Sequence, residues 1–159
     1  FKIVPRDGAS EFPEVLLHKF SKSRATQLEA QALGLHGNQS VFRIENVLHL
    51  QGKPVIHDKI IISEAMFPGL NQAAFTARAT TIYGYYQAEF GVTIVEADER
   101  VRAELITADS ARLLDLNEST PILRIDRVAH TFDRKPAEFR TSIVDTQSFD
   151  YVSRMREMK

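Results

Sequence analysis

The sequence predicts an α+β fold built on a largely antiparallel sheet. Two pairs of strand-like segments, 41–50 with 55–62 and 121–132 with 136–147, are each joined by a short turn and therefore predict two β-hairpins. Helix-like segments lie between the strands, at 24–35, 79–91 and 107–116. Adjacent hairpins produce antiparallel neighbours, whereas a doubly wound fold needs parallel strands joined by helices.

The first half of the chain is expected to contain one helix and one complete hairpin. A short apolar piece runs into loop residues around Pro5, a strand is expected at Glu14–Phe20, and the helix at 24–35 stops near Gly34. In 41–50 apolar and polar residues alternate, so the apolar ones share one face of a strand. Residues 63–75 contain Pro68-Gly69 and are expected to form a loop.

The second half repeats this organisation after a helix of its own. The helix at 79–91 ends at Gly91, and residues 92–105 are expected to form a long strand with a bend near Ala97-Asp98. The helix at 107–116 has either Thr107 or Asp109 as its N-cap. The second hairpin turns around the residues DRK at 133–135.

The two halves carry an internal repeat. A shift of 81 positions aligns LGLHGNQSVFRIENV at 33–47 with LDLNESTPILRIDRV at 114–128. Each copy is a short helix followed by a hairpin, and this spacing is too long for a solenoid or propeller. Helix-stop-strand patterns also recur by chance, but the match of Arg43-Ile44-Glu45 with Arg124-Ile125-Asp126 goes beyond such a pattern. We therefore expect two units joined edge to edge in one sheet about a pseudo-two-fold axis.

The copies differ where Asn46 aligns with Arg127, and both residues fall on the apolar face of their strand. A polar group on an inward face costs several kcal/mol unless it is paired. Each residue is therefore expected to belong to a buried polar network or to line a cavity.

The return strand of the second hairpin carries Glu138, Arg140 and Ser142 at alternate positions, hence on one face. These groups could bind a small polar ligand, or they could form a solvated outer face. If DR is a two-residue turn, Arg127 lies opposite Arg140, and two facing cations would favour an anion between them. A turn one residue longer would separate the two arginines.

Composition excludes several classes of protein. Twenty basic and 21 acidic residues give a net charge of −1, so no overall field favours nucleic acid or an anionic membrane. Cysteine is absent, which excludes disulfides and thiolate chemistry and is typical of a reducing compartment. The five histidines lack metal-binding spacing, so no metal and no cofactor is expected. No apolar run reaches the length of a membrane helix, and a cytoplasmic protein is expected.

The domain organisation follows from the same reading of the chain. Neither a linker nor a shift in composition divides it, so residues 1–159 are expected to form a single domain. The sequence starts at Phe1 and not at Met, from which we expect a fragment of a longer protein.

The repeated strands, the helix TTIYGYYQAEFGV at 80–92 and the strand PAEFR at 136–140 together resemble the effector-binding (UTRA) domain of HutC-type GntR transcription regulators. The resemblance covers nearly the whole chain. It implies a chorismate lyase-like fold around a small-molecule pocket, and a winged helix-turn-helix DNA-binding domain preceding this chain. It also implies a homodimeric, metabolite-responsive regulator, usually a repressor, in which the ligand modulates binding to operator DNA.

The resemblance also implies candidate ligand-binding residues. The pocket residues of the family fall on Glu138 and Asp58, on Thr81 and Tyr83 where the middle helix opens, and on Tyr151. Members that bind sugar phosphates carry an Arg-x-Arg pair where this chain has Asn46 and Leu48. A phosphosugar is therefore not expected; a small polar metabolite, such as a carboxylate met by Arg140 or Arg6, fits better.

Two other functions are compatible with this sequence. The first is a chorismate lyase-like enzyme, because the lyase reaction needs little more than a cationic pocket, although no catalytic residue is identified. The second is a dimerisation module without a ligand. The sensor is preferred, and the chain is not expected to be an enzyme.

Overall fold

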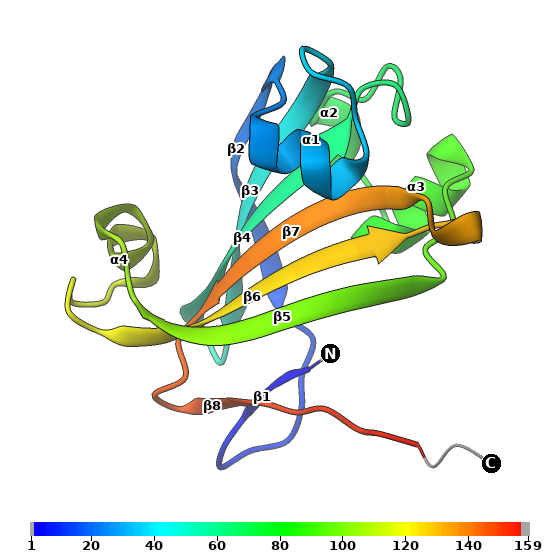
Figure 1. The fold of residues 1–159 in the computed structure, drawn as a ribbon. Coiled ribbons are helices and arrows are strands. Elements are labelled where there is room, and N and C mark those ends of the chain that lie inside the picture. The colour runs from blue at the N-terminus through cyan, green and yellow to red at the C-terminus, as the bar shows by residue number, and fades with distance from the viewer. Residues whose placement is uncertain (1, 157–159) are drawn as a thin grey trace.

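In the computed structural model, which describes residues 2–156, six strands form one antiparallel sheet in the order β2-β3-β4-β7-β6-β5. Strands β1 and β8 pair only with each other and form a separate two-stranded sheet, here called the terminal ribbon (Figure 1). The predicted α+β class with its antiparallel sheet is confirmed. The strands are β1 (Ile3–Pro5), β2 (Glu14–Arg24), β3 (Ser40–Leu50), β4 (Lys53–Ser63), β5 (Glu96–Leu105), β6 (Pro121–His130), β7 (Pro136–Val144) and β8 (Phe149–Tyr151).

The two repeated units meet where β4 pairs with β7. Unit one contains β2, helix α1 (Gln27–Leu33), β3 and β4, and unit two contains β5, helix α4 (Ala108–Leu114), β6 and β7. The expected edge-to-edge joining is confirmed, because the order β2-β3-β4 is followed by its mirror β7-β6-β5. The repeat extends one strand further than the sequence predicts, since β2 and β5 also occupy equivalent places.

The register gives the position of the approximate two-fold axis. Lys59 pairs with Thr141 near the centre of the β4–β7 contact. On either side of this pair, Asp58 lies opposite Ser142, and Arg140 lies opposite Ile60. Asp58 and Arg140 therefore occupy equivalent positions in the two units, next to the axis.

Tight turns fix the pairing within each hairpin. Gln51 and Gly52 have φ values of 52° and 72°, and Asp133 and Arg134 have φ values of 60° and 53°, as in type I′ turns. A short 3₁₀ turn, η1 (Phe132–Arg134), overlaps the second one. Of the two turn lengths considered for the second hairpin, the two-residue DR turn is observed, and Arg127 lies opposite Arg140.

Capping groups explain where the helices begin and end. Thr26 and Glu29 form a capping box at α1, and Gly34 ends that helix in the left-handed conformation. Thr107 caps α4, and this decides between the two N-cap candidates there. Helix α3 (Ile82–Phe90) ends at Gly91, as the sequence predicts, but it begins only after its N-cap Thr81, three residues later than expected.

Several boundaries differ from the prediction because tertiary contacts override the local pattern. Strand β2 continues to Arg24, four residues past the expected end, because β3 pairs with it along this length. Residues 92–95 are not strand, since Val92 and Ile94 pack against α3, and β5 begins only at Glu96. The expected loop at 63–75 contains the start of the short helix α2 (Gln72–Thr76), which Asn71 caps.

The two faces of the sheet are covered by different elements. The inner face, on the side of Phe42, Ile44, Ile60 and Ile62, packs against aromatic residues of α2 and α3 at one end. At its other end the inner face packs against the terminal ribbon, through Ile3 and Phe149. The opposite face packs against α4, where α4 contacts β4, and against α1, where α1 contacts β7.

Loss of the α1 capping box should reduce stability by a predictable amount. Thr26→Ala removes the hydroxyl that accepts from the Glu29 N–H, and the free energy of unfolding should fall by about 1 kcal/mol in urea denaturation. Thr76→Ala, at an exposed position at the end of α2, serves as the control and should change it by less than about 0.5 kcal/mol. Equal effects of the two substitutions would contradict the importance of the capping box.

Candidate ligand-binding site

The β4–β7 pairing gathers polar side chains at the middle of an otherwise apolar inner face. Asn46, Asp58 and Ser142 follow one another across β3, β4 and β7 as directly paired residues. Arg140 and Arg127 form the next rung of the ladder, across β7 and β6. Because directly paired residues point to the same side of a sheet, these five side chains share the inner face.

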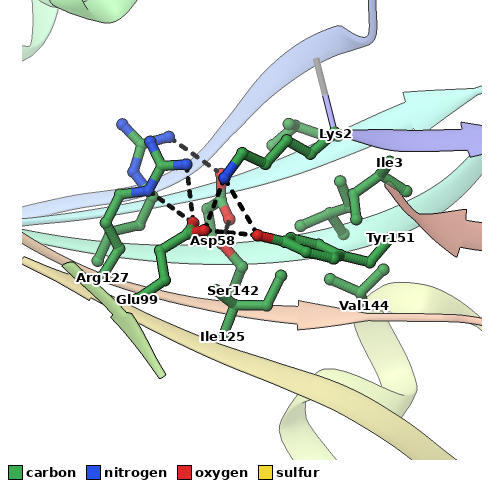
Figure 2. A pocket seen from close by; sticks show the side chains of 12 residues that line it. Lys2, Ile3, Asp58, Glu99, Ile125, Arg127, Ser142, Val144 and Tyr151 are labelled. Carbon is green, nitrogen blue, oxygen red and sulfur yellow. Dashed lines mark hydrogen bonds and ion pairs between the residues drawn. The ribbon is translucent and has the colours of Figure 1, made fainter. Parts of the chain in front are cut away.

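Two cavities lie over this polar centre. The ribbon cavity, of about 320 Å³, lies between the sheet and the terminal ribbon, and Lys2, Ile3 and Tyr151 line its outer side (Figure 2). The helix cavity, of about 540 Å³, lies between the sheet and the start of α3. Both are lined by Leu48, Asp58, Arg127 and Arg140, so the polar centre forms a common wall. Such volumes are in the range of small-molecule sites.

A buried ion pair anchors this wall. Glu138 is fully buried, and its two carboxylate oxygens accept from Arg140 at 2.8 and 3.1 Å. Tyr86 donates to Glu138 at 2.5 Å. Burial lowers the pKa of Arg140, but Glu138 and Asp58 raise it well above its ordinary value. Glu138 therefore holds a charged Arg140 in place and does not itself line either cavity.

Asp58 is buried beside this pair with fewer partners. Ser142 donates to it at 2.5 Å, and Nη1 of Arg140 lies 3.7 Å from its carboxylate. Burial raises the pKa of Asp58, and this outweighs the lowering effects of Arg140 and Ser142. Its carboxyl group is consequently easier to protonate than that of an exposed aspartate.

A second polar cluster ties the terminal ribbon to the sheet, as Figure 2 shows. Glu99 of β5 accepts from Arg127 at 2.9 Å, from Lys2 at 2.8 Å and from the Tyr151 hydroxyl at 2.6 Å. Burial raises the pKa of Glu99, but these hydrogen bonds lower it to about 2. Glu99 thus connects β1 and β8 to a cation on the cavity wall.

Asn46 is a polar residue of the site whose side-chain hydrogen-bonding groups are unused. Its side chain is 1% exposed and lines the helix cavity, yet neither its amide nitrogen nor its oxygen has a partner among residues 2–156. A buried unpaired amide costs about 1–3 kcal/mol. Of the two roles expected for this position, the cavity lining is the one observed.

The other sequence-predicted residues fall in different places. Thr81 caps α3 and lines the helix cavity together with Tyr83, whose hydroxyl accepts from Arg127 at 3.2 Å. Tyr151 lines the ribbon cavity. Arg6 lies outside both cavities, because its guanidinium binds Asp150 and the carbonyl oxygens of Thr146 and Gln147.

Three charged residues at the cavities were not among those predicted. Lys2, Glu99 and Arg78 line them, but each comes from a stretch whose pattern looks like ordinary surface or loop. Their proximity depends on segments far apart in the chain: Lys2 and Glu99 are separated by 97 positions. The alternating charges along β5 are the only sequence feature that points to Glu99, but an exposed edge strand has the same pattern.

Within residues 2–156, no group of three His, Asp or Glu side chains is arranged to hold a metal ion. The helices of this part of the chain are all too short or too polar to cross a membrane.

Polar residues at the centre of an antiparallel sheet line two cavities of ligand size. This arrangement is typical of a small-molecule-binding domain. The chain belongs to the UTRA domain family, whose profile matches residues 11–150. In structure it is similar to the ligand-binding domain of a protein assigned to the GntR family of transcriptional regulators from Bordetella bronchiseptica. That similarity has a TM-score of 0.93 and 28% sequence identity, and it covers 98% of this chain and 96% of the other.

Two further relatives extend this relationship. The HTH-type transcriptional repressor STM4068 of Salmonella typhimurium is 28% identical over 129 residues, which is 80% of this chain and 52% of the repressor. The chain therefore spans about half the length of that protein. PhnF from Mycobacterium smegmatis shares the fold, with a TM-score of 0.82, 19% identity and coverage of 98% of this chain and 72% of PhnF. The expected resemblance to UTRA domains of GntR-family regulators is confirmed.

Acid should weaken the attachment of the terminal ribbon. The pKa of Glu99 is lowered to about 2 in the folded chain from an ordinary value of 4.5, so its stabilising effect is complete above about pH 4.5. This effect is lost as the pH falls toward 2. In urea denaturation, the difference in unfolding free energy between the wild type and Glu99→Gln should therefore shrink from pH 6 to pH 3. A difference that stays constant over this range would contradict the assignment.

Proposed function

We propose that this chain is the domain of a HutC-type GntR-family repressor that senses a small polar metabolite. In this proposal the domain works in the cytoplasm as part of a homodimer, and a winged helix-turn-helix that precedes it in the full protein binds operator DNA. The effector changes the affinity of that protein for DNA. The observation that carries the ligand-sensing role is Asn46, a buried amide without partners on the wall of a cavity of ligand size.

The chemistry of the site favours a less highly charged ligand over a sugar phosphate. Asn46 and Leu48 stand where phosphosugar-binding relatives carry two arginines, and both line the helix cavity. Arg140 and Arg127 already face carboxylates, at Glu138 and Glu99. We assign ligand contacts to Asn46, Asp58, Arg140, Thr81, Tyr83 and Tyr151, with Glu138 positioning Arg140.

The terminal ribbon offers a physical route from the ligand to the DNA-binding part. Lys2 and Tyr151 close the ribbon cavity through Glu99, which also binds Arg127 on the shared wall. A ligand in the helix cavity that moves the Tyr83 hydroxyl, which accepts from Arg127, alters this contact and shifts β1, to which the preceding part of the protein is attached. A ligand that binds both arrangements equally would shift nothing.

The sensing role is tested by thermal-shift screening of this chain, followed by titration calorimetry of the compounds that bind. A true effector at 100 times its dissociation constant should stabilise the domain by about 2.7 kcal/mol. Absence of binding by any small polar metabolite, charged or neutral, would contradict a sensing function.

Asn46→Arg should change ligand preference more than stability. The new guanidinium restores a cation where phosphosugar-binding relatives have one, so phosphorylated sugars should gain affinity relative to the wild-type ligand by about tenfold or more. Calorimetry with both ligand classes measures this change, and Asn117→Arg, at an exposed position, is the matched control. If Asn46→Arg unfolds the domain and leaves the ligand profile untouched, Asn46 is a packing residue only.

We expect no enzymatic turnover. The fold is shared with chorismate lyase, and Arg127 and Arg140 provide cations, so chorismate is the appropriate substrate to test. Incubation of the chain with chorismate, followed by ultraviolet absorbance, should show no loss of substrate above the uncatalysed rate. Turnover that Arg140→Gln abolishes would establish the enzyme instead.

A further inference from the structure

Arg78, which follows α2, contributes a cation to the helix cavity that the sequence does not single out. Its guanidinium stacks over the Phe75 ring at 4.4 Å, and Nη1 donates to the Phe75 carbonyl oxygen at 2.9 Å. Its Nε is buried and has no partner among residues 2–156. A guanidinium has five N–H donors, so Phe75 fixes its position while leaving donor capacity unused.

Arg78 also differs from the other cations of the cavity in its charge balance. Arg140 pairs with Glu138 and Asp58, and Arg127 pairs with Glu99. No carboxylate of residues 2–156 forms an ion pair with Arg78, and Glu89 shares only a surface hollow with it. Burial lowers the pKa of Arg78, as does Arg140, while Tyr86 and Tyr85 raise it. Arg78 is therefore a partly buried positive charge without a counterion in this part of the chain.

The helix cavity also offers hydrogen-bonding groups that carry no positive charge. Asn46 presents an unpaired amide, and it lies directly opposite Asp58, whose pKa is raised by burial. An amide and a carboxyl group suit a hydroxyl or amide on the ligand, because each can accept a hydrogen bond from it. They do not provide a second anion site, because neither carries a positive charge.

We propose that Arg78 binds a carboxylate of the effector, while Asn46 and Asp58 bind a hydroxyl or amide group of the same molecule. The effector class is thus a compact monocarboxylate that carries a neutral polar group. This inference rests on the proposed sensing function and names its ligand class. One unmatched cation suits one negative charge; a phosphate dianion would have to displace Glu138 or Glu99 from its arginine.

The test is a binding screen of the wild-type chain with matched probe sets. One set contains monocarboxylates of three to eight carbons bearing a hydroxyl or an amide, such as 4-hydroxybutanoate and succinamate. The second set contains their neutral counterparts, 4-hydroxybutanamide and succinamide, and the third contains glycerol 3-phosphate and other sugar phosphates. Thermal shift identifies binders, and calorimetry measures their affinity. Members of the first set should bind, and their neutral counterparts should bind at least tenfold more weakly.

Variants assign the carboxylate to Arg78. Arg78→Gln should weaken binding of the best monocarboxylate by about 10- to 100-fold, as for loss of a hydrogen bond to a charged group. Arg78→Lys keeps the charge without the planar fork and should give an intermediate loss. Arg112→Gln, at an exposed position on α4, is the control and should leave the affinity unchanged. Circular dichroism checks that each variant is folded; if Arg78→Gln is not, the Lys variant decides.

The outcomes separate the two proposals. If phosphorylated or neutral compounds bind and monocarboxylates do not, or if Arg78 variants bind the carboxylate like the wild type, the ligand class is wrong while the sensing function stands. If no member of any set binds, both proposals are overturned.

Discussion

The pairing of β4 with β7 is the interaction on which the rest of the structure depends. It joins two units that each have an unpaired strand edge, and it makes one six-stranded sheet from them. Because Lys59 lies opposite Thr141, Asp58 meets Ser142, and Arg140 lies on the neighbouring rung. A slip of one residue would turn these side chains to the opposite face, toward α1 and α4, and would remove the polar centre from both cavities.

The two repeated units form the sheet, and the candidate site lies where their sequences differ. Asn46 paired with Asp58 in unit one corresponds to Arg127 paired with Arg140 in unit two. Equivalent positions on the sheet thus hold an amide and a carboxyl group in unit one and two guanidinium groups in unit two. The two cations of unit two are balanced by Glu138 and Glu99, so the unused bonding capacity lies in unit one, at Asn46.

The charges at the centre of the site are balanced mainly within the protein itself. Glu138 balances Arg140 and accepts from Tyr86, and Glu99 balances Arg127. Removing Glu138 would leave Arg140 with only Asp58, at 3.7 Å, as its counterion among residues 2–156, and breaking a buried ion pair in this way typically costs 3–5 kcal/mol. Asn46 and Arg78 stand outside these networks and keep unused hydrogen-bonding groups at the helix cavity, which is the reason for placing the proposed ligand contacts on them.

The sequence by itself determined the units and their faces. Strand alternation, the type I′ turn at Asp133-Arg134 and the capping Thr residues act locally, so the hairpins, the α+β class and the inward position of Asn46 followed from the chain alone. Only the tertiary structure decided the terminal ribbon, whose strands are three residues long and too short for a periodic signal. It also decided the roles of Glu99, Arg78 and Arg6, because whether a charge lines a cavity or binds a surface loop depends on partners brought together from distant parts of the chain.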